Sequence, residues 1–235
     1  MIWSTLIGDY ELNIIKIVFG IYIMIKSREL RGKSLIEYKK SLQLTSLQRE
    51  VLVGTLLGNA TLPPTSYIKF EQNLSKAEYI YHLYNIFEPF VGTPPRIRNI
   101  PGGNARPRQS IWFRTYQHPA FRFYNNLFYI YENPNRKKRV PKNIPKLLTP
   151  RGLAYWFMND GTFSRKSVKT RDYFFSTQSF TLSDQKKLQK VLYEQFNIKT
   201  NIHKDKNYYR LYILKNSSNQ LIQLIQQYIQ PCFFL

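Results

Sequence analysis

The sequence predicts an α+β protein of two pseudo-symmetric αββαββα halves, whose two antiparallel sheets form a basic saddle. Three observations predict this fold class. The 235 residues are enough to bury a sizeable core. Apolar segments with helical and alternating spacing recur in the same order in both halves. The 35 Lys and Arg against 14 Asp and Glu, a net charge of +21, indicate a polyanionic partner. Nucleic acid is favoured, with an anionic membrane surface as the alternative.

The chain divides by composition into four parts. We expect an N-terminal extension with an apolar helix (1–40), a first half (41–132), a basic linker (133–147) and a second half (148–235). The apolar run 14–25 is interrupted by Lys16 and is short for a membrane span. We expect it to pack on the main domain or on a partner; a weak membrane segment or a leader left by gene rearrangement is the alternative.

The first half contains short apolar runs bounded by turn residues. Segment 46–58 predicts a helix with Gly54 and Gly58 on one face. The further elements that the spacing predicts are a strand at 67–73, a helix at 76–90, a hairpin of 95–100 with 109–117, and a helix at 118–131.

The second half repeats that order after a linker whose prolines predict irregular structure. Thr149 followed by Pro150 predicts the start of an apolar helix that reaches Gly161. The remaining predicted elements are a strand at 172–180, a helix at 183–197 capped by Ser183, a hairpin of 200–205 with 208–214, and a helix at 218–231 ended by Pro231.

Composition also excludes several classes of protein. A single cysteine, Cys232, cannot form an internal disulfide, so a secreted disulfide scaffold is excluded. The histidines at 82, 118 and 203 are far apart, so no zinc site is expected, and no small-molecule substrate is indicated. Richness in Ile, Asn, Lys and Tyr suits an AT-biased organellar genome, and we expect a location in the mitochondrial matrix.

Aromatic residues lie beside cations along the chain, as in YIKFEQ and IWFRTY, a pattern that suits base stacking combined with phosphate contacts. Strand alternation would leave one face of each sheet free to be basic. The predicted nucleic-acid contacts are Lys69, Arg96, Arg98, Arg106, Arg108, Arg114, Arg136, Lys137, Lys138, Arg139, Arg165, Lys166, Lys204, Lys206 and Arg210.

Two of the apolar segments carry a family resemblance. LAYWFMNDG (153–161) resembles the second motif of the monomeric LAGLIDADG homing endonucleases, and GTLLGNA (54–60) resembles the tail of the first. HPAFRFYNNLF and STQSF resemble the mitochondrial intron-encoded branch, and the resemblance spans residues 44–230. It implies that two motif helices pack through small residues, here Gly54, Gly58 and Ala154. Each helix would then bring one acid to bound Mg²⁺, which activates water.

This sequence departs from the family at the acid of the first motif. The eighth motif position is Asp160 in the second copy but Asn59 in the first, and Glu50 lies too far back along its helix to replace it. Asn removes the charge that holds a hard cation. Mg²⁺ on Asp160 is therefore expected only in an active enzyme, and otherwise no cofactor. The structural alternative is that Asn59 merely ends a helix and Asp160 only forms hydrogen bonds.

Two further features bear on activity. Lys138 falls where the family branch has a basic active-site residue, and Lys206 could serve in the second half; both are equally explained as phosphate contacts. Segment ATLPPTS (60–66) leaves little room for the first strand of a recognition hairpin, because Pro lacks the ladder donor.

The sequence thus predicts a degenerate LAGLIDADG protein that binds nucleic acid and does not cleave both strands. Structured organellar RNA is favoured over DNA, with the protein serving as an intron maturase or as a ribosomal-RNA-associated structural component. It would be a monomer by internal pseudo-symmetry, and its N-terminal extension could contact ribosomal proteins. The alternative is an active or nicking site-specific DNA homing endonuclease that uses Mg²⁺. Engineered inactivation fits less well, because neither Asn159 nor the shortened loop would be needed for it.

Overall fold

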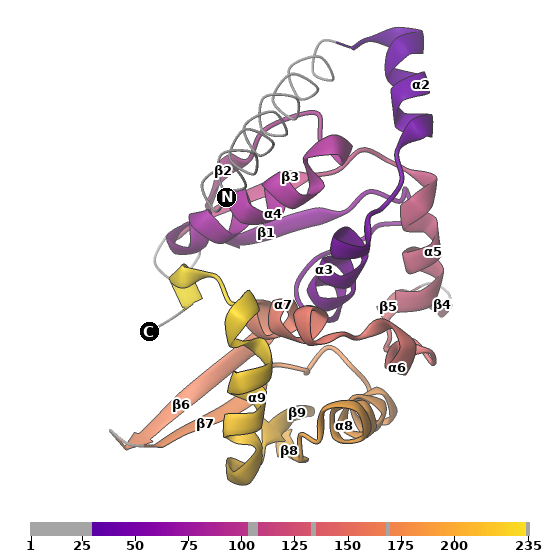
Figure 1. Cartoon of the computed structure of the whole chain (residues 1–235). Coiled ribbons are helices and arrows are strands. Elements are labelled where there is room, and N and C mark those ends of the chain that lie inside the picture. The colour runs from indigo at the N-terminus through magenta and orange to yellow at the C-terminus, as the bar shows by residue number, and fades with distance from the viewer. Residues whose placement is uncertain (1–29, 103–107, 133–134, 168–169, 234–235) are drawn as a thin grey trace, which may run out of the picture.

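The computed structural model describes residues 30–102, 108–132, 135–167 and 170–233, and the apolar run 14–25 lies outside them. Two helices occupy the centre, α3 (Ser46–Leu57) and α7 (Pro150–Asp160), and the sheets of the two halves lie on either side of this pair (Figure 1). Both sheets are antiparallel, as predicted. No helix in the described ranges is long and apolar enough to cross a membrane.

The first sheet has three strands in the order β1-β3-β2, namely β1 (Lys69–Asn73), β2 (Arg96–Ile100) and β3 (Arg108–Arg114). Helices α4 (Ala77–Phe87) and α5 (Pro119–Phe128) complete this half. Phe70 of β1 lies 5.1 Å from Phe87 of α4 and 4.9 Å from Phe113 of β3, measured between ring centroids. Since all three rings are buried, they join the helix to the inner face of the sheet.

A fourth strand is reduced here to one bridge, Thr61 with Lys69. Two prolines follow, and the chain turns at once, with the Ser66 N–H donating to the Pro63 carbonyl at 2.9 Å. Because proline has no N–H, this segment cannot extend the ladder. The expected shortening of this strand is confirmed, and the first half runs αβαββα where αββαββα was predicted.

The second half has the full predicted order. Its sheet runs β6-β7-β9-β8, and its elements are β6 (Gly161–Ser167), β7 (Thr170–Phe175), α8 (Leu182–Phe196), β8 (Thr200–Asp205), β9 (Tyr208–Ile213) and α9 (Ser218–Ile225). Several boundaries differ from those predicted. No residue range was predicted for strand β6, and β7 ends at Phe175, whereas the predicted strand reached residue 180. Thr181, not Ser183, caps α8, and α9 ends before Pro231.

The linker is not irregular, so that prediction was wrong. It holds β5 (Asn135–Lys138), paired with β4 (Tyr129–Glu132), and helix α6 (Ile144–Leu147). The Arg136 guanidinium lies 3.5 Å from the centroid of the Tyr129 ring and donates to the carbonyl of Leu62 and the side chain of Asn125. These contacts tie β5 to the shortened strand segment and to α5.

The charged segment after residue 30 also contains an unpredicted helix, α2 (Gly32–Ser41), with no buried residue. Short 3₁₀ turns complete the described chain: η1 (Leu74–Lys76), η2 (Glu88–Phe90), η3 (Lys215–Ser217), η4 (Gln226–Tyr228) and η5 (Pro231–Phe233).

Candidate nucleic-acid interface and motif site

The two motif helices approach closely through glycines. A Cβ placed on Gly54 would overlap the carbonyl oxygen of Gly152, and one placed on Gly58 would overlap the side chain of Asn159. Ala154, the predicted packing residue of α7, is fully buried, but Gly152 is the residue that faces Gly54. Gly152 was missed, although its position in the first turn after the Thr149 cap could have indicated it.

The ends of these helices bring together Asn59, Asp160 and Lys138. Asn59 is exposed, whereas Asp160 and Lys138 are half-buried, and the Lys138 Nζ donates to the Gly58 carbonyl at 2.5 Å. Burial lowers the pKa of Lys138 to about 8, offset in part by the charge of Asp160. Burial raises the pKa of Asp160 to about 6, and Lys138 opposes that rise. The site therefore holds one carboxylate and one partly desolvated ammonium group.

The nearest upstream acid lies at the opposite end of the helix pair. The Glu50 carboxylate accepts a hydrogen bond from Thr149 Oγ1 at 2.7 Å and lies 3.4 Å from Arg151, both at the start of α7. Within the described ranges, no three His, Cys, Asp or Glu side chains are grouped to hold a metal. A two-metal centre needs carboxylates from both motifs, and the residues present do not fit it.

Five of the predicted cations share one face of the first sheet. Phe70, Ile111 and Phe113 are buried on the inner face, so their neighbours along each strand point outward. We call this outer surface the basic face; its residues are Lys69, Glu71, Arg96, Arg98, Arg108, Ser110, Trp112 and Arg114. The basic face thus carries five cations, one carboxylate and a half-buried tryptophan, Trp112. The centroid of the Trp112 ring lies 5.3 Å from Lys69 Nζ. Such a surface suits phosphate contacts and stacking.

The linker cations contact the protein itself. Arg136 holds the hairpin as described, and Arg139 donates to the carbonyls of Leu127 and Asn126 at the end of α5. Lys137 forms a 2.5 Å ion pair with the exposed Glu132. Arg136 and Arg139 therefore have roles in the fold, whereas Lys137 forms only an exposed ion pair, and all three lie outside the basic face.

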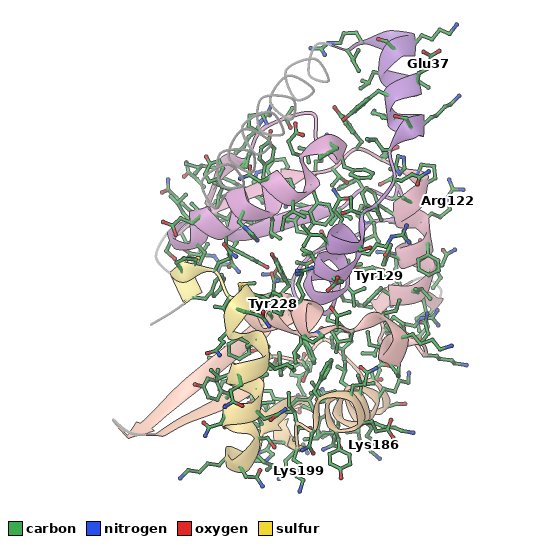
Figure 2. The ribbon with its side chains drawn as sticks, viewed as in Figure 1. Glu37, Arg122, Tyr129, Lys186, Lys199 and Tyr228 are labelled. Carbon is green, nitrogen blue, oxygen red and sulfur yellow. The ribbon has the colours of Figure 1, made fainter. Side chains whose placement is uncertain are left out.

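The remaining predicted contacts belong to the second half, apart from Arg106. Arg106 lies outside the described residues, and the side chains of Arg165 and Lys166 are likewise not described. Lys204 and Lys206 are exposed, with Lys206 at a φ of 54° in the β8–β9 turn, and Arg210 pairs with Asp205 at 2.7 Å. Exposed cations also occur over the helices, such as Arg122 on α5 and Lys186 on α8 (Figure 2).

A polar network that the sequence did not reveal links α7 to α4. The Asn159 Nδ2 donates to the Tyr79 hydroxyl at 2.9 Å and to the Tyr155 carbonyl at 2.6 Å. The Tyr155 hydroxyl lies 2.5 Å from His82 Nε2, and burial raises the pKa of Tyr155 to about 12. Because Tyr79 is 80 residues from Asn159 and His82 is 73 residues from Tyr155, no local pattern could have indicated these contacts. The network fixes the residue next to Asp160.

The family model described as "LAGLIDADG DNA endonuclease family" matches residues 49–221, well over half of the chain. The chain belongs to this family. Among proteins similar to this LAGLIDADG chain, the cytochrome b mRNA maturase bI2 of Debaryomyces hansenii is 30% identical over 211 residues, covering 86% of this chain and 76% of the relative. The DNA endonuclease I-ChuI of Chlamydomonas applanata is 28% identical, covering 81% and 94%.

A solved structure is also similar. It is the homing endonuclease I-WcaI bound to its DNA recognition sequence, with a TM-score of 0.78 and 27% identity over 86% of this LAGLIDADG chain and 90% of that chain. The family and fold expected from the two motifs are thereby confirmed. The relatives carry the names of both intron-encoded endonucleases and maturases.

Proposed function

We propose that this chain binds structured intron RNA as a maturase and does not cleave both strands of DNA. One observation carries the proposal: Asp160 ends α7, but exposed Asn59 occupies the corresponding motif position, just after the end of α3. Hydrolysis of both strands needs an activated water on each, and an amide cannot supply the charge that would hold a second cation. The loss of one acid would remove double-strand cleavage while leaving the rest of the fold in place.

The basic face supports binding as the retained activity. It carries five cations and only one carboxylate, so a polyanion can make many phosphate contacts there. The shortened strand leaves this sheet narrower than its four-stranded counterpart, and less strand surface is available to read a duplex groove. A folded RNA offers phosphates together with unpaired bases, which a narrow sheet with a tryptophan can contact.

The relatives' names support the choice of ligand. One relative is named a maturase of cytochrome b mRNA, and this name supports intron RNA as the ligand and an organellar location for this chain. We propose the mitochondrial matrix as that location. Ribosomal RNA is the alternative RNA ligand, with the N-terminal extension contacting ribosomal proteins. In either role we propose a monomer, since both motif helices belong to one chain.

A second candidate is an enzyme that nicks one strand. Asp160 favours it, because one carboxylate together with substrate phosphates can hold Mg²⁺. In that case Asp160 would be the metal ligand, and Mg²⁺ would supply an activated water. The endonuclease names, and the DNA-bound structure of I-WcaI, support this alternative.

Crosslinking followed by sequencing of the bound RNA tests the proposal. The native chain is expected to enrich one intron RNA, and the double change Arg98→Ala with Arg114→Ala on the basic face should abolish that enrichment. Arg122→Ala on α5 is the matched control, because Arg122 is exposed on a helix outside the basic face, and it should leave enrichment unchanged. Enrichment of ribosomal RNA instead would overturn the intron assignment, and enrichment of no RNA would overturn RNA binding altogether.

A further inference from the structure

A carboxylate sits among the cations of the basic face, where it would repel phosphate. The Glu71 Oε1 accepts a hydrogen bond from Ser110 Oγ at 2.6 Å, and its Oε2 pairs with Lys69 Nζ at 2.5 Å. Burial alone would raise the pKa of Glu71, but hydrogen bonds from Lys69 and Ser110, and the charge of Arg98, hold it below its usual value. Glu71 is therefore ionised at neutral pH and held in one orientation.

The hydrogen bonds leave acceptor capacity on both oxygens. An ionised carboxylate offers about four lone-pair sites, two on each oxygen. Ser110 uses one site on Oε1, and Lys69 uses one on Oε2. Each oxygen therefore keeps one site, so the carboxylate can still accept two hydrogen bonds, one on each oxygen. This arrangement suits a partner with two adjacent N–H donors.

The carboxylate borders a pocket large enough for a nucleobase. Its volume is about 400 Å³, and its lining includes Glu71 and Asn73 from β1, Arg98 from β2, and Arg108 and Ser110 from β3. The two arginines belong to β2 and β3, which lie on the same side of β1, and their guanidinium groups provide further donors at this pocket. A ligand that fits has two adjacent donors for Glu71 and an acceptor or phosphate for the arginines.

We propose that this pocket holds an unpaired guanine, whose N1–H and N2–H₂ donate to the two oxygens of Glu71; this inference rests on the proposed RNA-binding function. Unpaired RNA bases are read on their Watson–Crick edges. Guanine alone among the four bases places two donors side by side on that edge. Adenine and cytosine place a ring nitrogen acceptor next to their amino group, and uracil has one donor between two acceptors, so each would repel the carboxylate. The guanine O6 accepts from Arg98 or Arg108.

The competing explanation is that Glu71 only positions Lys69 to bind phosphate. In that case the identity of the base would not matter, and loss of Glu71 would change affinity for every RNA by the same factor. A test must therefore measure base preference as well as affinity.

RNA hairpins with an all-uridine loop and one variable central nucleotide provide the probes. We would measure dissociation constants by fluorescence anisotropy at one salt concentration for guanosine, inosine, adenosine and cytidine at that position. Inosine keeps N1–H and O6 but lacks the 2-amino group. The native chain is expected to bind the guanosine loop about 10-fold more tightly than the inosine loop. Glu71→Gln should still bind all four hairpins, with that ratio reduced to about one.

The control is Glu132→Gln, which removes the same charge from an ion pair with Lys137 outside the basic face. It should keep the guanosine preference of the native chain. Equal binding of all loops by the native chain, or an unchanged preference in Glu71→Gln, would overturn base reading by Glu71 and leave the proposed function intact. Failure of the native chain to bind any hairpin would also overturn base reading by Glu71, whereas the proposed function is overturned only if crosslinking enriches no RNA.

Discussion

Replacement of Gly54 by alanine should separate the two motif helices. The added Cβ would overlap the Gly152 carbonyl oxygen, which is backbone and cannot rotate away, so one helix must shift. Overpacking of a core costs about 1–3 kcal/mol, and this rigid contact belongs at or above the upper end of that range. Alanine regains about 1 kcal/mol of helix propensity. The net loss of unfolding free energy is thus about 2–3 kcal/mol.

Thermal unfolding measured by circular dichroism is the assay. In a chain of this length, such a loss lowers Tm by roughly 4–12 °C. Gly152→Ala is the matched control, since its Cβ would meet the Glu50 carbonyl oxygen at 3.2 Å, a tight contact that a small shift relieves. That variant should unfold within about 2 °C of the native chain, because helix propensity offsets the cost. A Gly54→Ala protein as stable as the native chain would refute the close packing of α3 on α7.

Further changes test separate contacts. Lys138→Met should raise the pKa of Asp160 further above about 6 in a carbon-detected NMR titration, because the ammonium is what opposes the rise. In this variant, the unfolding free energy should fall as pH rises through the raised pKa of Asp160. Below that pKa the folded state holds a proton on Asp160 that the unfolded state has already lost, and this difference disappears as Asp160 ionises. Arg136→Ala should lower the unfolding free energy by about 2–4 kcal/mol in urea, since buried acceptors lose their donor; Lys137→Ala should change it by less than about 0.5 kcal/mol. Thr181→Ala should cost about 1 kcal/mol in the same assay as the cap of α8.

Local chemistry explains which features the sequence could predict. Pro63 and Pro64 lack the N–H that a ladder strand needs, so the loss of that strand followed from the residues themselves. Thr149 capping and the spacing of Gly54 and Gly58 likewise placed the motif helices. Even the Thr181 cap was readable, because Asp184 stands three residues later and donates its N–H to the Thr181 hydroxyl.

Contacts between distant segments explain the failures. The linker hairpin depends on Arg136 reaching Leu62 and the Tyr129 ring, and nothing in a proline-rich sequence indicates such a contact. The acceptor sites of Glu71 depend on Ser110, which only the strand register brings near. The structure therefore divides the predicted nucleic-acid contacts into groups. Five of them share the basic face, whereas Arg136 and Arg139 donate to carbonyls of their own chain.

A duplex-cleavage assay shows whether the chain lacks double-strand cleavage because Asn59 replaces an acid. The native chain and Asn59→Asp would each be incubated with Mg²⁺ and a library of supercoiled plasmids carrying randomised inserts, and linear product would be measured. Asn59 is exposed, so the change restores a carboxylate opposite Asp160 with little effect on the fold. We expect no linear product from the native chain, because only one motif helix ends in an acid. Linear product from the native chain would contradict this expectation.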